Sequence, residues 1–180
     1  SIGGMLPVVV MYSTFSQRVF DQLWHDVILQ KAKMILMLSH SGLVPGDGVT
    51  HQGIYDPGLF AGLPGVHIDS PDTYTEMRKS FNEAMGYDGL SVIRYPKSGE
   101  AVYDSSFRDH GTWKTAEIGN GNHWIAVLTY GRIAGQVISA VKKLNEMNPD
   151  CRYTVVILRR IRPLDTEGLI RICGGCERLV

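Results

Sequence analysis

Short apolar runs alternate with amphipathic segments along the first part of the chain. Residues 7–12 form a continuous apolar, β-branched run, which is typical of a strand buried on both faces of a parallel sheet. Apolar residues then recur at helical spacing over about residues 15–31, and Thr14 with Gln17 has the spacing of a capping box. A second buried strand is predicted over residues 34–38. The pattern therefore predicts a βαβ unit, because parallel strands need a crossover of this length.

The same alternation of strand and helix patterns continues to the end of the chain. We predict further strands over residues 66–69, 90–94, 123–129 and 154–158, helices over residues 73–85, 133–147 and 166–172, and another strand beginning at residue 179. Residues 98–122 are polar and contain glycine without a convincing long element, so we expect an interdomain linker there. The predicted fold class is α/β, with a parallel-sheet domain over residues 1–97 and part of a second α/β domain over residues 123–180.

A glycine-rich segment over residues 40–53 follows the second predicted strand. It contains four glycines and a proline without sustained periodicity, and structureless connections of this length are more often functional than accidental. Open α/β sheets bind ligands at the loops that follow the carboxyl ends of their parallel strands. The turn over residues 12–15 should lie at the same edge, so we predict a ligand site there.

Composition excludes several classes of partner. Hydrophobic residues make up 44% and charged residues 20% of the 180 residues, which is ordinary for a globular protein. The 18 basic residues balance the 18 acidic ones, so no global field favours nucleic acid or an anionic membrane. No apolar run approaches the length of a bilayer, and the start lacks the pattern of a secretory signal. We expect a cytoplasmic protein with neither nucleic acid nor membrane as a partner.

The cysteines favour free thiols. An odd number of three, Cys151, Cys173 and Cys176, fits a reducing compartment better than a disulfide framework. The spacing of Cys173 and Cys176 also occurs in zinc knuckles and redox pairs, but tetrahedral zinc wants four ligands and the sequence has no second pair. We therefore expect no metal site in this chain.

Three ordered motifs carry a resemblance to a known family. They are Tyr12-Ser13-Thr14-Phe15-Ser16-Gln17-Arg18, Asp47-Gly48-Val49-Thr50-His51-Gln52-Gly53 and Arg94-Tyr95-Pro96. In this order and spacing they resemble the 1-deoxy-D-xylulose-5-phosphate synthase family of transketolase-like thiamine-diphosphate enzymes, and residues 161–165 are similar to that family too. The resemblance implies most of a transketolase-type pyrimidine-binding domain, truncated at its N-terminus, followed by the start of the C-terminal domain.

The resemblance also implies a reaction, a transfer of a two-carbon unit. Enzymes of the family condense pyruvate with D-glyceraldehyde 3-phosphate and release carbon dioxide. Their product is a precursor in isoprenoid and thiamine synthesis. Thiamine diphosphate and Mg²⁺ would be cofactors of the intact enzyme. The glutamate that activates the cofactor would precede Gly3-Gly4, and the diphosphate and metal site would lie in an N-terminal domain. We therefore expect a fragment that is inactive alone and that forms a homo-oligomer.

The motifs assign roles to individual residues by resemblance. His51, Asp47 and Tyr12 match residues that face the substrate, and we take them as the catalytic set. An imidazole exchanges protons near neutral pH, and a carboxylate accepts hydrogen bonds from hydroxyl groups. Phe15 matches the aromatic ring that lies against the aminopyrimidine of the cofactor, and a flat ring suits a flat heterocycle. Arg18 is expected to line the cofactor pocket.

Three further residues are expected to bind substrate, two of them at the positions that contact the acceptor phosphate in the family. His40 and Lys97 stand where the family has arginine, and Arg94 of the third motif completes the substrate-binding set. Lysine binds phosphate as a point charge, whereas histidine is only partly charged near neutrality and cannot form a bidentate fork. The resemblance therefore predicts weakened phosphate recognition and leaves open another aldehyde as acceptor.

Plainer interpretations stand beside these assignments. Without the motifs, Phe15 is the first core position of a helix, Asp47 a turn residue, His51 a surface imidazole, Tyr12 a sheet-edge tyrosine and Arg18 an exposed helix residue. At the level of function, a binding or assembly module that kept the fold without the chemistry is an alternative. A related transketolase or the β subunit of a 2-oxo-acid dehydrogenase is another.

Overall fold

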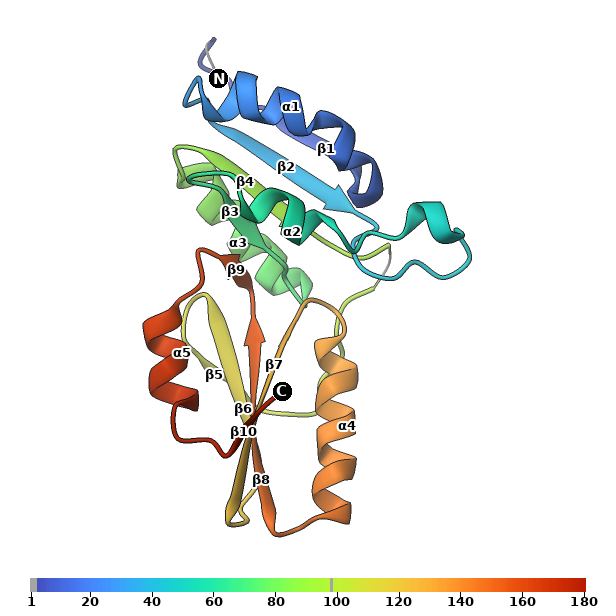
Figure 1. Ribbon diagram of the computed structural model, residues 1–180, viewed down its shortest axis with the longest axis vertical. Coiled ribbons are helices and arrows are strands. Elements are labelled where there is room, and N and C mark those ends of the chain that lie inside the picture. Colours follow the sequence, from blue (N-terminus) through green and yellow to red (C-terminus); the bar gives the residue numbers. More distant parts are fainter. Residues whose placement is uncertain (1–2, 98) are drawn as a thin grey trace.

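The chain forms two α/β units, each built on a five-stranded sheet (Figure 1). This computed structural model describes residues 3–97 and 99–180. The first unit contains the segments up to residue 97, coloured blue to green in Figure 1, and the second contains the rest, coloured yellow to red. Ser1, Ile2 and Ser98 lie outside the described residues, so the first residue of the expected linker is among those not described.

Four parallel strands form most of the sheet of the first unit, in the order β1-β2-β4-β3. Their bounds are Val8–Tyr12 for β1, Met34–Ser39 for β2, His67–Asp69 for β3 and Leu90–Arg94 for β4. This confirms the predicted parallel α/β fold and its βαβ start. The helical segments are η1 (Ser13–Val19), α1 (Phe20–Gln22), η2 (Leu23–Ile28), η3 (Val49–His51), α2 (Asp56–Ala61) and α3 (Tyr74–Gly86).

Helices cover both faces of this sheet because successive strand residues point to opposite sides. Leu36 and Leu38 of β2 pack in one cluster with Phe60 of α2 and Leu23 of η2. Ile35, on the other face, packs in a cluster with residues of α3. The crossover between β1 and β2 starts as a 3-10 helix, continues for one short α-helical stretch and ends as a π-helix. The predicted helix of residues 15–31 is therefore helical but irregular.

The second unit repeats the two-faced arrangement around a mixed sheet in the order β10-β7-β8-β6-β5. Val155 of β8 packs with Ile138 of α4, whereas Val156 packs with Leu169 of α5. Within the described residues, no helix combines the length and the hydropathy that crossing a membrane needs. The strands are β5 (Arg108–Asp109), β6 (Trp113–Gly119), β7 (His123–Tyr130), β8 (Cys151–Leu158) and β10 (Arg178–Leu179), and the helices are α4 (Ala134–Met147) and α5 (Thr166–Cys173).

Two expectations about this architecture are corrected. Strand β1 is not buried on both faces, because it pairs only with β2 among the described strands, and Val8, Val9 and Val10 are 44%, 40% and 61% exposed. The segment 98–122 is not irregular throughout, because residues 113–119 form β6, which pairs antiparallel with β8. The first expectation failed because a continuous apolar run does not indicate how many neighbouring strands a strand has. The second failed because β8, the partner of β6, lies far along the chain. The domain boundaries at residues 97 and 123 remain a prediction.

The chain passes from the second sheet to the first between two successive strands. After β8 the chain continues as β9 (Arg160–Arg162), which pairs antiparallel with β3 of the first unit. The backbone N–H of Ser70 also donates to the carbonyl of Arg159 at 2.6 Å. Both sheets therefore contain antiparallel pairs, and the second unit is anchored directly on the edge of the first.

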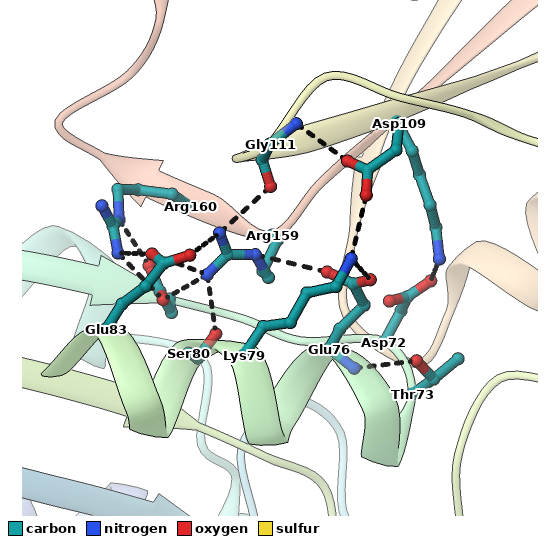
Figure 2. A network of polar contacts seen from close by, with 12 residues as sticks. Asp72, Thr73, Glu76, Lys79, Ser80, Glu83, Asp109, Gly111, Arg159 and Arg160 are labelled. Atoms are coloured by element: carbon teal, nitrogen blue, oxygen red, sulfur yellow. Dashed lines mark hydrogen bonds and ion pairs between the residues drawn. The ribbon is translucent and has the colours of Figure 1, made fainter. Parts of the chain in front are cut away.

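A network of charged side chains surrounds this crossover (Figure 2). Arg159 is 3% exposed, and its guanidinium donates to Asp69 at 3.1 Å and to Glu83 at 2.7 Å. It also donates to the carbonyl of Gly111 at 3.0 Å, which belongs to the second unit. Arg160 binds the same two carboxylates, each at 2.8 Å. The buried guanidinium is thus compensated from both units, as a charge removed from water requires.

This network leads to a prediction about stability. Arg159→Met should lower the free energy of unfolding by about 3 kcal/mol, because the buried carboxylate of Asp69 then keeps Arg160 as its one arginine partner and the carbonyl of Gly111 loses its donor. Urea unfolding followed by circular dichroism measures the loss. Lys33→Met is the matched control, because Lys33 pairs with the exposed Asp88 at 3.6 Å and should change stability by less than about 1 kcal/mol. Equal losses in the two variants would contradict this view of the network.

Candidate functional site

Four aromatic rings gather where β1 and β2 end. Tyr12 is the last residue of β1, and His40 follows β2. Their rings stack with centroids 3.8 Å apart and planes inclined by 18°. Phe15 stacks on Tyr12 at 5.7 Å, and His51 meets Phe15 edge-on at 5.4 Å and Tyr12 at 6.4 Å. The structure therefore brings Tyr12, Phe15, His40 and His51 together at one edge of the sheet, where the sequence analysis expected the turn over residues 12–15 and the segment 40–53 to meet.

The turn that presents His40 has an uncommon backbone. His40 has φ 57°, in the left-handed region that non-glycine residues rarely adopt. The turn is held by the backbone N–H of Ser41, which donates to the carbonyl of Tyr95 at 2.9 Å. The side-chain hydroxyl of Ser41 donates to the carbonyl of Leu38 at 3.0 Å. Strained residues of this kind cluster at functional sites, because the surrounding structure must enforce them.

The glycine-rich segment is ordered by its own polar groups. The side chain of Gln52 accepts from the backbone N–H of Val44 at 2.7 Å and donates to the carbonyl of Gly48 at 2.7 Å. A backbone bridge joins Gly42 and Gly53. The expectation of a structureless loop is therefore too simple, because η3 and these contacts shape it.

Thr14 connects this loop to the start of the first crossover helix. Its hydroxyl donates to the carbonyl of Thr50 at 2.9 Å, and η1 begins at Ser13 without a side-chain cap. The predicted capping box is therefore wrong, because Thr14 lies inside the helical segment and its hydroxyl is used across the site. The Thr50 hydroxyl in turn lies 2.9 Å from Nδ1 of His51, which fixes the orientation of that ring.

Asp47 and Lys97 form an ion pair beside the rings. Lys97 Nζ lies 2.7 Å from Asp47 Oδ1, although the two residues are far apart in sequence. The hydrogen bond from Lys97 holds the pKa of the Asp47 carboxyl below its usual value, and the nearby His40 and His51 act in the same direction. Asp47 is therefore a carboxylate at neutral pH, and Lys97 is engaged with it.

Phe15 and Tyr12 remain partly accessible to solvent, with each residue 37% exposed. The guanidinium carbon of Arg18 lies over the Phe15 ring, 5.8 Å from its centre. A partly exposed aromatic ring next to a cation suits a flat, polar heterocycle. Of the cofactor implied by the sequence, the aminopyrimidine is the part that these residues fit.

The residues present do not extend this fit to a metal-bound diphosphate. Among the described residues, no group of three or more histidine, cysteine, aspartate or glutamate side chains is placed to hold a metal ion. Cys151, Cys173 and Cys176 are free thiols, and burial raises the pKa of Cys173. The described residues thus provide an aromatic and acid–base surface without a metal centre.

Arg94 lies beneath the site and does not face open space. It is 5% exposed, and its Nε and Nη2 donate to Asp56 Oδ2 at 2.7 Å and Oδ1 at 3.1 Å. The expectation that Arg94 binds substrate is therefore corrected, because its guanidinium is buried and bound to Asp56. Asp56, which is itself buried, also accepts from the hydroxyl of Ser13 at 2.8 Å. Sequence reasoning missed Asp56, because an aspartate before a proline has the pattern of a turn.

The fold defines the chain as a transketolase-type α/β protein. A family profile described as "Transketolase, pyrimidine binding domain" matches residues 1–99. The chain therefore belongs to the family of transketolase pyrimidine-binding domains. A solved structure titled "Split gene transketolase, inactive beta4 tetramer" superposes with a TM-score of 0.79 at 22% identity, covering 99% of this chain and 57% of the other.

The particular relatives are synthases, which confirms the resemblance found in the motifs. The chain is 36% identical over 178 residues to the 1-deoxy-D-xylulose-5-phosphate synthase of Polaromonas naphthalenivorans, covering 98% of this chain and 27% of that protein. It is 34% identical over 178 residues to the synthase of Dechloromonas aromatica, covering 98% of this chain and 28% of that protein. The chain thus spans about a quarter of the length of these curated relatives.

The Asp47–Lys97 pair yields a prediction about titration. Lys97→Met should raise the pKa of the Asp47 carboxyl toward the ordinary value of about 3.9, because its strongest hydrogen-bond donor is lost. Carbon-13 NMR of the carboxyl group across a pH series measures this change. Lys33→Met, which removes a lysine that pairs with Asp88, should leave the titration of Asp47 unaltered. An Asp47 pKa that stays the same in Lys97→Met would show that the pair does not persist in solution.

Proposed function

We propose that this chain provides the pyrimidine-facing and substrate-facing part of a 1-deoxy-D-xylulose-5-phosphate synthase. The reaction is the thiamine-diphosphate-dependent condensation of pyruvate with D-glyceraldehyde 3-phosphate, with release of carbon dioxide. The observation that carries the proposal is the group of Tyr12, Phe15, His40 and His51 rings beside the Asp47–Lys97 pair. These residues lie in a chain that is 36% identical to a curated synthase.

The partly exposed ring of Phe15 is the proposed contact for the aminopyrimidine ring of the cofactor, with the guanidinium of Arg18 next to it. Thiamine diphosphate, when bound, supplies the stabilisation of negative charge on carbon that the transfer needs. The protein then has to hold the reactants, move protons and exclude water. Mg²⁺ and the diphosphate would be bound by segments of the relatives that this chain does not match.

His51 is proposed as the group that exchanges a proton with the substrate. Its Nδ1 is occupied by the Thr50 hydroxyl at 2.9 Å, so Nε2 is the nitrogen left to face a substrate oxygen. Phe15 holds the ring edge-on and limits its rotation. A fixed imidazole with one free nitrogen suits general acid–base catalysis, in which the geometry of the proton transfer comes first.

Asp47 and Lys97 are proposed to bind the acceptor substrate. The carboxylate of Asp47 can accept hydrogen bonds from hydroxyl groups, and Tyr12 can donate one from the end of β1. Lys97 would contact the phosphate as a point charge, after its present contact with Asp47 is rearranged. His40 is proposed as a further contact for this phosphate. The acceptor phosphate is thus held by weaker cations than a pair of arginines would supply.

A second candidate is a binding or assembly module without catalysis. The engagement of Lys97 with Asp47 favours it, because that pair neutralises the two groups on which acceptor binding relies. The fold by itself is equally compatible with either function. The two candidates differ in whether the chain can replace the corresponding part of an active synthase.

A chimeric synthase distinguishes the two candidates. The chain should replace the matched region of the Polaromonas naphthalenivorans synthase and retain product formation from pyruvate and D-glyceraldehyde 3-phosphate, because it contributes a complete half of the site. The chain by itself should form no product, because much of the cofactor-binding surface would be absent. A chimera that folds and is stabilised by thiamine diphosphate in a thermal shift assay, yet makes no product, would favour the module.

Two substitutions in the active chimera should separate the proposed roles. His51→Ala should lower turnover by about a hundredfold to ten-thousandfold, since general acid–base help is lost mainly in the transition state. Lys97→Ala should chiefly raise the KM for D-glyceraldehyde 3-phosphate, and the effect should shrink with an unphosphorylated aldehyde. Steady-state kinetics measures both. Near-normal turnover of His51→Ala, or an equal effect of Lys97→Ala on both aldehydes, would show that the assigned role is wrong.

A further inference from the structure

We propose that Arg94 is a positioning residue that holds the segments of the site in register from below. Its guanidinium contacts four groups from different parts of the chain. Besides the two hydrogen bonds to Asp56, Nη2 donates to the carbonyl of Gly53 at 3.3 Å, and Nη1 lies 3.4 Å from the hydroxyl of Ser70. The ring of Tyr130, from β7 of the second unit, lies 5.5 Å from the guanidinium carbon.

The Gly53 contact places the loop that carries His51. Gly53 lies two residues after His51, and its N–H and carbonyl form the bridge to Gly42 at 2.9 Å and 2.7 Å. A methyl group at Gly53 would collide with the carbonyl oxygen of His40 and would lie 2.7 Å from Oγ of Ser13. Gly53 is therefore wedged between the turn of His40 and the start of η1. A shift of its carbonyl must move both of these segments.

The Asp56 contact places the segment that carries Tyr12 and Phe15. Oδ1 of Asp56 accepts both from Nη2 of Arg94 and from the hydroxyl of Ser13, which lies between those two aromatic residues in sequence. The carbonyl of Ser13 accepts from the hydroxyl of Ser16 at 2.6 Å, which fixes the first turn of η1. One buried guanidinium thus determines, through Asp56 and Gly53, where the rings on both sides of the site lie.

Stability alone does not account for a charge at this position. Well-packed apolar side chains can replace a buried ion pair without loss of stability. An apolar pair cannot hold several acceptors in fixed directions, whereas the planar guanidinium has five N–H donors in a rigid fork. Lysine has the same charge but no fork, so it cannot reach Asp56 and Gly53 together in this geometry. The distinctive property of Arg94 is therefore the direction of its hydrogen bonds.

The test compares Arg94→Lys with Arg159→Lys in the 180-residue chain. Both variants keep a positive charge and lose a fork that binds buried carboxylates, but Arg159 lies at the junction between the units. The observable is the ring-proton NMR signal of His51 and of His40, which the neighbouring aromatic rings displace from the value of free histidine. His110, which stacks on Trp113 at 4.0 Å in the second unit, is the internal reference for Arg94→Lys.

Arg94→Lys should move the His51 and His40 signals toward the free-histidine value and leave that of His110 in place. Arg159→Lys should leave both site histidines in place. Unchanged His51 and His40 signals in Arg94→Lys, or equal movements in the two variants, would overturn the proposal. If Arg94→Lys does not fold, the double variant Arg94→Met/Asp56→Leu, in which both buried charges are removed, decides by the same signals.

This inference rests on the proposed function for the role of the rings in catalysis. The positions of the rings do not depend on that function. The NMR signals report the placement of the rings whether or not a reaction occurs. If the chimera forms no product but the His51 and His40 signals move in Arg94→Lys, the proposed synthase function is wrong and the positioning role of Arg94 is supported. If the chimera is active but these signals do not move in Arg94→Lys, the proposed synthase function is supported and the positioning role of Arg94 is wrong.

Discussion

The parallel pairing of β1, β2 and β4 is the constraint from which the candidate site follows. Tyr12 lies opposite Ser39, and Leu38 lies opposite Arg94, so the three strands end almost level with one another. Their loops must therefore leave from one edge of the sheet. The hydrogen bond from Ser41 to the carbonyl of Tyr95 extends the alignment past the ends of the strands. Motifs that are far apart in sequence therefore meet at this edge.

Buried guanidinium groups supply the second level of organisation. Arg94 lies under the site and Arg159 at the junction, and both are almost completely removed from water. Each is surrounded by carboxylate and carbonyl oxygens from segments that are distant in sequence. The desolvation of such a charge is costly unless all of these acceptors are in place. The two arginines therefore make local geometry depend on the tertiary arrangement, and Tyr130 links the first of them to the second unit.

The site itself divides into an aromatic part and a charged part. Phe15 and Tyr12 offer partly exposed aromatic rings, whereas Asp47 and Lys97 form an ion pair with one charge of each sign. His51 lies against the aromatic part, with Nδ1 held by Thr50. This division suits a ligand that has a flat heterocycle on one side and a polyhydroxy or phosphorylated chain on the other. The chain spans about a quarter of the length of the curated relatives it matches.

The sequence by itself determined the α/β class, the order of most strands and helices, and the meeting of Tyr12, Phe15 and His51. Those features follow from local hydrophobic periodicity and from the rule that parallel strands share an edge. Only the tertiary structure decided that β1 is exposed, that β6 and β9 are strands, and that Arg94 binds Asp56 beneath the site rather than a ligand. The number of neighbours of a strand and the partner of a buried charge depend on residues far along the chain, and periodicity within a short window contains no information about them.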